Sequence, residues 1–167
     1  MRRTDAEQLA RQLMRRWRCE GWDFKWSHGK RQLGCAVIRK HRVSGRILSR
    51  QLRLSCYLVD LNDEPQVRET ILHEIAHIKA GIHNGHNQVW KRWCRKVGAK
   101  PQRCYRESEV KLVEANYLID CANCKKVVGK RMRKVKDVKK LYCKKCGPSS
   151  LGNLRLRVNP KGSRPQA

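Results

Sequence analysis

Long apolar runs and acidic residues are both scarce in this sequence of 167 residues. No stretch of about 18 apolar residues occurs, so no transmembrane helix and no membrane partner is expected. Asp5 and Glu7 stand where a secretory signal would have its apolar segment, which argues against such a signal. Only 14 acidic residues face 40 lysines and arginines, giving a formal net charge of +26. A chain with this balance is expected to bind a polyanion, and nucleic acid is the natural candidate.

The positive charge is concentrated at the two ends of the chain. Residues 1–53 carry 15 basic and 4 acidic side chains, residues 54–120 carry 10 and 9, and residues 121–167 carry 15 and 1. Either basic end alone is compatible with a solvated surface. Two basic ends around a nearly neutral middle favour a protein that holds nucleic acid at its ends.

Hydrophobic periodicity and turn residues predict an α+β fold. Helices are expected over residues 4–20, 62–81 and 87–97. Strands are expected over residues 22–26, 33–38, 46–54 and 117–119. Thr4 and Glu7 have the spacing of a capping box at the start of the first helix. The end of the chain is rich in proline, glycine and serine, and residues 159–167 are predicted to form a flexible tail.

The second predicted helix carries the sequence His73-Glu74-Ile75-Ala76-His77. Side chains four residues apart lie on one face of a helix, so His73 and His77 can both reach one zinc ion. Glu74 would lie beside that ion as the catalytic general base that takes a proton from water. The alternative is a helix with two unrelated surface histidines. Ile71 and Ile75 argue against it, because they indicate a partly buried helix in which unpaired polar groups are costly.

A catalytic zinc site needs a third protein ligand and an open position for water. His83 and His86 both follow the helix closely enough to supply that ligand. His86 is favoured because Gly81 and Gly85 allow the chain to turn back toward the helix. His83 is then interpreted as an exposed loop histidine.

Four cysteines form two pairs, Cys121 with Cys124 and Cys143 with Cys146, and 18 residues separate the pairs. This spacing is typical of a zinc ribbon, in which four thiolates hold one structural zinc ion and leave no position open. The ion supplies folding energy to a segment with little hydrophobic core. Two disulfides or a redox pair are the alternatives, but the total of nine cysteines is odd and disfavours a disulfide framework. A reducing, cytoplasmic location is therefore expected.

The segment between the two cysteine pairs is strongly basic. The cations taken as nucleic-acid contacts are Lys125, Lys126, Lys130, Arg131, Arg133 and Lys134. A rigid ribbon that presents these side chains suits phosphate backbones. Tyr142 is interpreted as packing beside the zinc site, with stacking on a base as the alternative. The other five cysteines and the five tryptophans are interpreted as core residues, although Trp22 and Trp26 would suit base stacking if exposed.

These motifs resemble the SprT-like zinc metalloprotease family. Residues 71–77 (ILHEIAH), Gly85-His86 and Trp90-Lys91 are similar to the family pattern, in which an HGxxW-like element follows HExxH. Asn87 stands where that pattern has its glycine. The terminal four-cysteine ribbon is similar too, so that the resemblance covers about residues 5–157. Small prokaryotic and bacteriophage members are the most similar in size.

The resemblance implies a zincin-like metalloprotease domain over residues 1–116 and a small β zinc ribbon over residues 117–158. It implies one catalytic zinc ion, with His86 as the third ligand, and one structural zinc ion. Spartan relatives in this family degrade proteins that are crosslinked to DNA. We therefore expect a zinc endopeptidase that acts on DNA-bound or DNA-crosslinked proteins, located in the cytoplasm at the nucleoid or, for a phage protein, in the host. No obligate oligomer is expected.

Two other functions are compatible with the sequence. The first is a nucleic-acid-binding zinc protein with little or no peptidase activity. The second is a ribbon protein associated with RNA or the ribosome. For an enzyme, Tyr105 is the nearest candidate for stabilising the oxyanion, with a buried structural tyrosine as the alternative.

Overall fold

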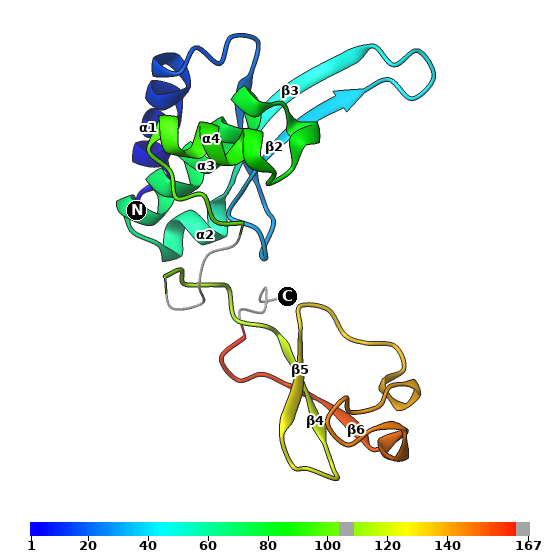
Figure 1. Cartoon of the computed structure of the whole chain (residues 1–167). Helices are drawn as coiled ribbons and strands as arrows, with labels where there is room; N and C mark the ends of the chain where they lie inside the picture. Colours follow the sequence, from blue (N-terminus) through cyan, green and yellow to red (C-terminus); the bar gives the residue numbers. More distant parts are fainter. Residues whose placement is uncertain (104–108, 163–167) are drawn as a thin grey trace. The chain divides into compact units, whose positions relative to one another are not determined.

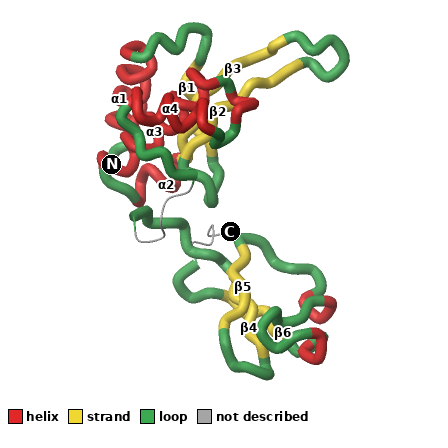
Figure 2. The backbone as a smooth tube through the Cα atoms, in the orientation of Figure 1, coloured by secondary structure: helices red, strands yellow, loops and turns green. Residues whose placement is uncertain are grey.

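The chain is divided into two units, Met1–Leu112 and Val113–Ala167 (Figure 1). The computed structural model describes residues 1–103 and 109–162. The first unit combines helices with a three-stranded sheet, and the second contains a small sheet of its own (Figure 2). The predicted α+β class is confirmed. Within the described ranges, no helix has the length and apolar character needed to cross a bilayer.

One edge strand of the sheet in the first unit lies against the helix that carries the histidine motif. Its strands are β1 (Asp23–Ser27), β2 (Gly34–Lys40) and β3 (Ile47–Ser55). The order is β1-β3-β2, with β3 parallel to β1 and antiparallel to β2. Leu52 and Leu54 of β3 are buried in the core, as the alternation of a half-buried strand requires. β2 is an edge strand and contacts helix α3 (Glu64–Ala80).

Helix α3 is the central helix of the first unit. The other helices are α1 (Arg3–Arg16), α2 (Cys56–Leu61), the 3-10 turn η1 (Ile82–Asn84) and α4 (Gln88–Val97). α3 packs against α1, α4 and β2. Its residues Val67, Ile71 and Ile75 are buried, as their helical spacing predicts. This packing fixes the backbone that carries the histidines.

Helix α1 differs from the prediction at both ends. The capping box does not form, because Thr4 lies inside the first turn rather than before it. Glu7 instead accepts a hydrogen bond from the indole of Trp26 in β1. The helix ends at Arg16, four residues earlier than predicted. Arg18 has a φ of 47°, which is incompatible with a continuing right-handed helix.

The short helix α2 was not predicted. It follows β3 without a turn, and Ser55 caps it by accepting a hydrogen bond from the N–H of Leu58. Asn62, interpreted as part of the start of α3, has another role. Its buried side chain donates to the carbonyl groups of Leu58 and Lys111 and accepts from the N–H of Lys111. The chain at residue 111 is thereby fastened to the end of α2.

The second unit has a very small hydrophobic core. Its strands β4 (Tyr117–Cys121), β5 (Val127–Arg131) and β6 (Leu154–Val158) form an antiparallel sheet in the order β5-β4-β6. The 3-10 turns η2 (Val138–Lys140) and η3 (Pro148–Ser150) lie between β5 and β6. The buried cluster of this unit consists of Ile119, Cys121, Cys143 and Leu154.

The described structure continues beyond the predicted end of the ribbon. Asn159, the first residue of the predicted tail, is buried, and its side chain donates to the carbonyl of Ala115. Gly162 then donates its N–H to the carbonyl of Asn159. Residues 113–116, assigned to the protease domain in the prediction, group with the second unit.

Candidate functional site

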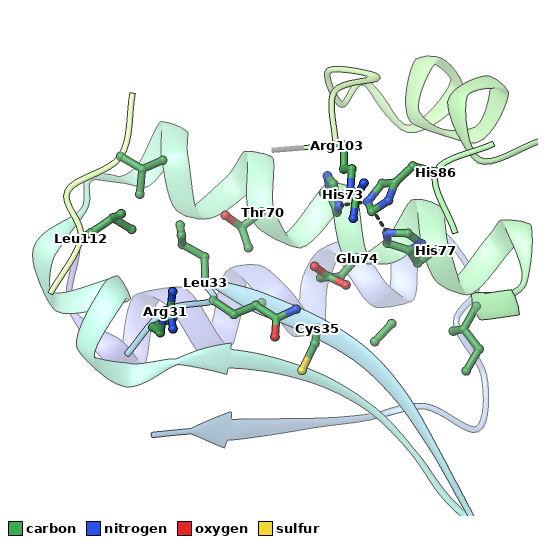
Figure 3. A pocket seen from close by; sticks show the side chains of 15 residues that line it. Arg31, Leu33, Cys35, Thr70, His73, Glu74, His77, His86, Arg103 and Leu112 are labelled. Carbon is green, nitrogen blue, oxygen red and sulfur yellow. Dashed lines mark hydrogen bonds between the residues drawn. The ribbon is translucent and has the colours of Figure 1, made fainter. Parts of the chain in front are cut away.

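Three histidine rings converge beside helix α3 (Figure 3). His73 and His77 project from successive turns of the helix, and His86 comes from the loop that follows. Gly81 ends the helix with a φ of 87°, and Gly85, with a φ of 53°, helps the chain return toward it. The Nε2 atom of His86 lies 3.3 Å from Nε2 of His77 and 3.4 Å from Nε2 of His73.

The spacing of these nitrogen atoms fits a tetrahedral zinc ion. Two nitrogens that each lie about 2.05 Å from zinc at a tetrahedral angle are about 3.3 Å apart. The distances of 3.3 and 3.4 Å reproduce this value. Three imidazoles leave the fourth tetrahedral position open, which is the arrangement of a catalytic rather than a structural site. The ligand nitrogens of all three rings lie within 4.8 Å of one another, so the three rings could together hold one zinc ion.

Burial keeps the three imidazoles neutral. It lowers the pKa of His73 to about 3 and that of His77 to about 4, and neighbouring histidines act in the same direction. The pKa of His86 is also lowered, first by burial and then by the charge of Arg103. Neutral imidazole is the form that binds metal. Protons therefore do not compete for these nitrogens at neutral pH.

Glu74 is 94% buried and is held against strand β2. Burial raises its pKa to about 7, while a hydrogen bond with the backbone of Ala36 opposes part of this rise. A carboxyl group with a pKa near the working pH is suited to accept and return a proton. Gly34 allows the close approach of strand and helix, because a Cβ there would lie only 3.1 Å from Cγ of Glu74.

A cavity of about 510 Å³ opens beside the histidines and Glu74. Leu33, Val110 and Leu112 contribute apolar walls. Arg31 and Arg103, both labelled in Figure 3, add positive charge. Cavities of a few hundred Å³ with a few polar groups are typical of ligand sites. A substrate segment can therefore lie next to both the candidate metal ligands and the candidate base.

Trp90 forms a wall behind the three histidines. Its indole is fully buried, and its ring centroid lies 4.9, 5.3 and 4.6 Å from those of His73, His77 and His86, respectively. The indole Nε1 has no hydrogen-bond partner among the described residues. Its contribution is therefore packing, which restricts the orientations of the rings.

The structure distinguishes between the two candidates for the third zinc ligand, His83 and His86. His83 is exposed and lies outside the cluster, with its Nε2 atom 3.2 Å from the side-chain nitrogen of Asn84. Cys35 and Arg103 line the cavity although nothing in their sequence spacing singles them out. They reach the site only through the packing of distant segments. Tyr105, the predicted oxyanion candidate, lies outside the described residues.

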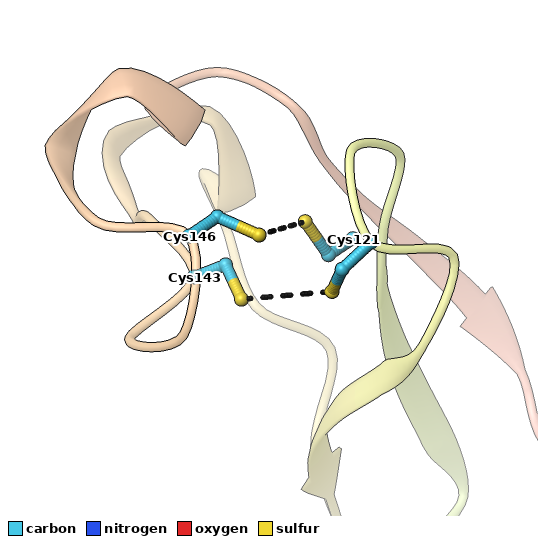
Figure 4. Close-up of side chains that lie close together, drawn as sticks. Cys121, Cys143 and Cys146 are labelled. Atoms are coloured by element: carbon cyan, nitrogen blue, oxygen red, sulfur yellow. Dashed lines mark hydrogen bonds between the residues drawn. The ribbon is translucent and has the colours of Figure 1, made fainter.

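Four cysteine thiols form a second candidate metal centre (Figure 4). The sulfur atoms of Cys121 and Cys146 are 4.0 Å apart, and those of Cys124 and Cys143 are 3.9 Å apart. Thiolates at about 2.3 Å from a tetrahedral zinc ion are about 3.8 Å apart, whereas disulfide sulfurs are about 2.05 Å apart. Hydrogen bonding, led by the backbone of Cys146, lowers the pKa of Cys143 to about 7. The cluster fits a closed four-thiolate zinc site and contains no disulfide.

The six ribbon cations predicted to contact nucleic acid are all exposed. None of them forms an ion pair with any described acidic residue; the ribbon ion pairs involve Lys140 and Arg157 instead. Tyr142 is 51% exposed, so packing beside the zinc site and stacking on a base both stay predictions for its ring. Trp22 and Trp26 are partly buried against the core of the first unit, as interpreted.

Comparisons with known proteins identify the family. The model of the SprT-like family matches residues 3–111. Germ cell nuclear acidic protein of Drosophila melanogaster is 28% identical over 164 residues, which is 88% of this chain and 15% of that protein. The human protein of the same name is 28% identical over 87 residues, 48% of this chain and 12% of its own length. This chain thus spans less than a sixth of these relatives. Because the family model matches well over half of its length, the chain belongs to the SprT-like family.

Proposed function

We propose that this chain is a zinc-dependent endopeptidase with a zincin-like catalytic domain, acting on proteins bound or crosslinked to DNA. The observation that carries the proposal is the convergence of three imidazoles, two of whose Nε2 separations match a tetrahedral zinc ion, next to a buried carboxyl group and a cavity. Membership of the SprT-like family supports a peptidase. The relatives are named as nuclear proteins, which supports work close to DNA.

In this proposal His73, His77 and His86 hold the zinc ion. The ion, when bound, would polarise the scissile carbonyl and acidify the attacking water. Glu74 accepts a proton from that water and passes it to the nitrogen of the leaving amine. The apolar cavity wall keeps bulk water away from the carboxylate, and Trp90 holds the histidine rings in position.

The ribbon serves this activity by binding DNA. Cys121, Cys124, Cys143 and Cys146 hold a structural zinc ion, which stabilises a unit whose own core is very small. The exposed cations of the segment from Lys125 to Lys134 then contact phosphates.

The proposed chemistry is tested by zinc analysis and a cleavage assay. We expect two zinc ions per chain and about one in a His73→Ala/His77→Ala variant. The cleavage of a DNA-binding protein by the zinc-loaded chain is measured without DNA, with single-stranded DNA and with double-stranded DNA. We expect the protein to be degraded in at least one of these conditions. Glu74→Gln should lower that rate by about 10²-fold or more, because no other group at this position can accept the proton.

Three outcomes would count against the proposal. Unchanged cleavage by Glu74→Gln would show that the assigned mechanism is wrong. Failure of the zinc-loaded chain to cleave under any DNA condition would favour the nucleic-acid-binding protein without peptidase activity. Tighter binding to RNA than to DNA at matched salt would favour an RNA-associated role.

A further inference from the structure

We propose that the end of the β2–β3 hairpin, residues 39–50, is a second nucleic-acid-binding element that enters the major groove of duplex DNA. We call this segment the arm. This inference rests on the proposed function in taking DNA as the partner. The charge of residues 1–53 predicts that this basic end takes part in nucleic-acid binding, but the individual contact residues named from the sequence all lie in the ribbon; the inference assigns the contact in the first unit to a particular element.

The arm is built into the core at its base and free at its end. In the parts of β2 and β3 from which the arm extends, Leu52 and Leu54 are buried, and Gly34 packs against α3. Toward the tip, every residue from 39 to 48 is exposed, and Val43 is 90% exposed. Figures 1 and 2 show the ends of β2 and β3 and their connecting turn extending past the helices of this unit. The arm therefore offers both of its faces to a partner.

The tip of the arm is a hydrogen-bonded turn. The N–H of His41 donates to the carbonyl of Arg46 at 2.7 Å, and the N–H of Gly45 donates to the carbonyl of His41 at 2.9 Å. The N–H of Ser44 also donates to Nδ1 of His41, at 3.2 Å. The strand ladder continues up to the pair Lys40 and Ile47. A partner would therefore meet a preorganised ribbon, which reduces the entropy lost on binding.

The charge of the arm has one sign only. The sequence contains no acidic residue between Asp23 and Asp60. The exposed cations of the arm are Arg39, Lys40, Arg42, Arg46 and Arg50. No ion pair joins any of these five to the acidic groups that the structure describes. Charged side chains on exposed strands also prevent pairing with the strands of other proteins, but acidic residues serve this purpose as well as basic ones. Protection against such pairing therefore does not explain why every charge on the arm is positive.

Duplex DNA is the partner that best fits this shape and charge. The major groove of B-form DNA is about 12 Å wide and admits a two-stranded β-ribbon. Four of the five arm cations are arginines, whose guanidinium groups bind phosphates and guanine edges through two hydrogen bonds. Val43 at the tip can contact thymine methyl groups. The major groove of duplex RNA is too deep and narrow for such a ribbon.

The test compares two variants of the full, zinc-loaded chain that lose the same charge. The arm variant carries Arg39→Gln, Lys40→Gln, Arg42→Gln and Arg46→Gln. The control variant removes four exposed cations from α1 and α4 by Arg15→Gln, Arg16→Gln, Arg92→Gln and Arg95→Gln. Binding to a 20-base-pair DNA duplex, a duplex RNA, a single-stranded DNA and phosphatidylserine vesicles is measured by fluorescence titration at several salt concentrations.

We expect the arm variant to bind duplex DNA at least about tenfold more weakly at 100 mM salt, with a salt slope smaller by about 3 to 4. The control should lose at most about threefold. The loss on duplex RNA should be clearly smaller than on duplex DNA. Methyl green, a major-groove ligand, should compete with the intact arm, whereas netropsin, a minor-groove ligand, should not.

Equal losses in the arm and control variants would overturn the proposal. So would equal losses on DNA and RNA duplexes, which would indicate backbone contact without groove entry. A loss confined to the vesicles would assign the arm to an anionic membrane surface instead. Because binding is measured without turnover, absence of peptidase activity would reject the proposed function and leave the assignment of the arm intact.

Discussion

Gly34 is the point at which strand β2 meets helix α3, and its replacement by alanine tests how the sheet positions Glu74. An added Cβ would lie 2.8 Å from Cγ2 of Thr70, 3.1 Å from Cγ of Glu74 and 3.3 Å from the carbonyl oxygen of Arg53. Carbon atoms in contact prefer about 3.5–4.0 Å, so strand and helix must separate by several tenths of an ångström. Thr70 cannot easily yield, because it is buried and its hydroxyl donates to the carbonyl of Gln66.

The expected loss of stability and activity in Gly34→Ala follows from the steric overlap of the added Cβ with Thr70 and Glu74. Overpacking of a buried contact typically destabilises a protein by about 1–3 kcal/mol. Catalytic groups tolerate displacements of only about 0.5 Å. Gly34→Ala should therefore lower the free energy of unfolding of the first unit by about 1–3 kcal/mol and reduce cleavage by about tenfold or more.

Tryptophan fluorescence measures this free energy selectively. All five tryptophans lie between residues 17 and 93, so a urea titration followed by their emission reports on the first unit. Gly29→Ala is the matched control, since the nearest atom to its added Cβ is 3.6 Å away. The control should stay within about 0.5 kcal/mol of the unchanged chain.

A rescue variant identifies the contact responsible. Thr70→Ser removes the methyl group that approaches Gly34 most closely and keeps the hydroxyl that bonds to Gln66. In the double variant, the cost of Gly34→Ala should shrink by about 1 kcal/mol relative to its cost alone. If Gly34→Ala is as stable and active as Gly29→Ala, or if Thr70→Ser gives no rescue, then this contact does not set the position of Glu74.

Three further sets of predictions concern the ribbon, the buried thiols and the hydrogen bonds that Asn62 forms with Leu58 and Lys111. Cys143→Ser should remove one zinc ion per chain and unfold the second unit, seen as loss of amide dispersion in NMR spectra, while tryptophan emission stays unchanged. Burial raises the pKa of Cys19 to about 11 and that of Cys94 to about 12, so iodoacetamide should leave both unmodified in the folded chain at pH 8. In the unfolded chain these thiols ionise at about pH 8.5, well below their pKa values in the folded chain. Their contribution to the free energy of unfolding is therefore complete below about pH 8.5 and is lost as the pH rises toward 11 and 12. The urea midpoint should accordingly be lower at pH 10 than at pH 8. Asn62→Ala should cost about 1–3 kcal/mol in the same titration, because two carbonyls and the N–H of Lys111 lose a buried partner.

The candidate ligands could be predicted from the sequence because each set depends on local spacing. His73 and His77 are one helical turn apart, and each cysteine pair lies within four residues, so backbone geometry alone brings the ligands of each pair together. His86 needed one additional inference, the chain reversal that Gly85 permits. The predicted strands are all present to within two residues, since their alternation reflects one buried face.

The rest of the site depends on contacts between distant segments, which no local pattern encodes. The environment of Glu74 is set by Gly34 and Ala36, about 40 residues earlier in the chain. The start of α1 shows the same effect. The amino group of Met1 donates to the carbonyl of Asn62, and this tertiary contact helps place the helix start earlier than the capping-box pattern indicated.

In the proposed function, most of the positive charge lies outside the segment that carries the zinc ligands. Phosphate oxygens are potential zinc ligands, so a polyanion drawn into the cavity would compete with a peptide carbonyl for the open position. Residues 54–120, which hold the three candidate zinc ligands, have 10 basic and 9 acidic side chains. Among the described residues that line the cavity, Arg31 and Arg103 are the only lysine or arginine residues. Two dense groups of exposed cations without an ion pair to the described acidic residues lie instead on the arm and on the ribbon. A protein that binds DNA while cutting a neighbouring protein requires such a separation, because the same positive charge that increases DNA affinity would inhibit the enzyme if it surrounded the metal.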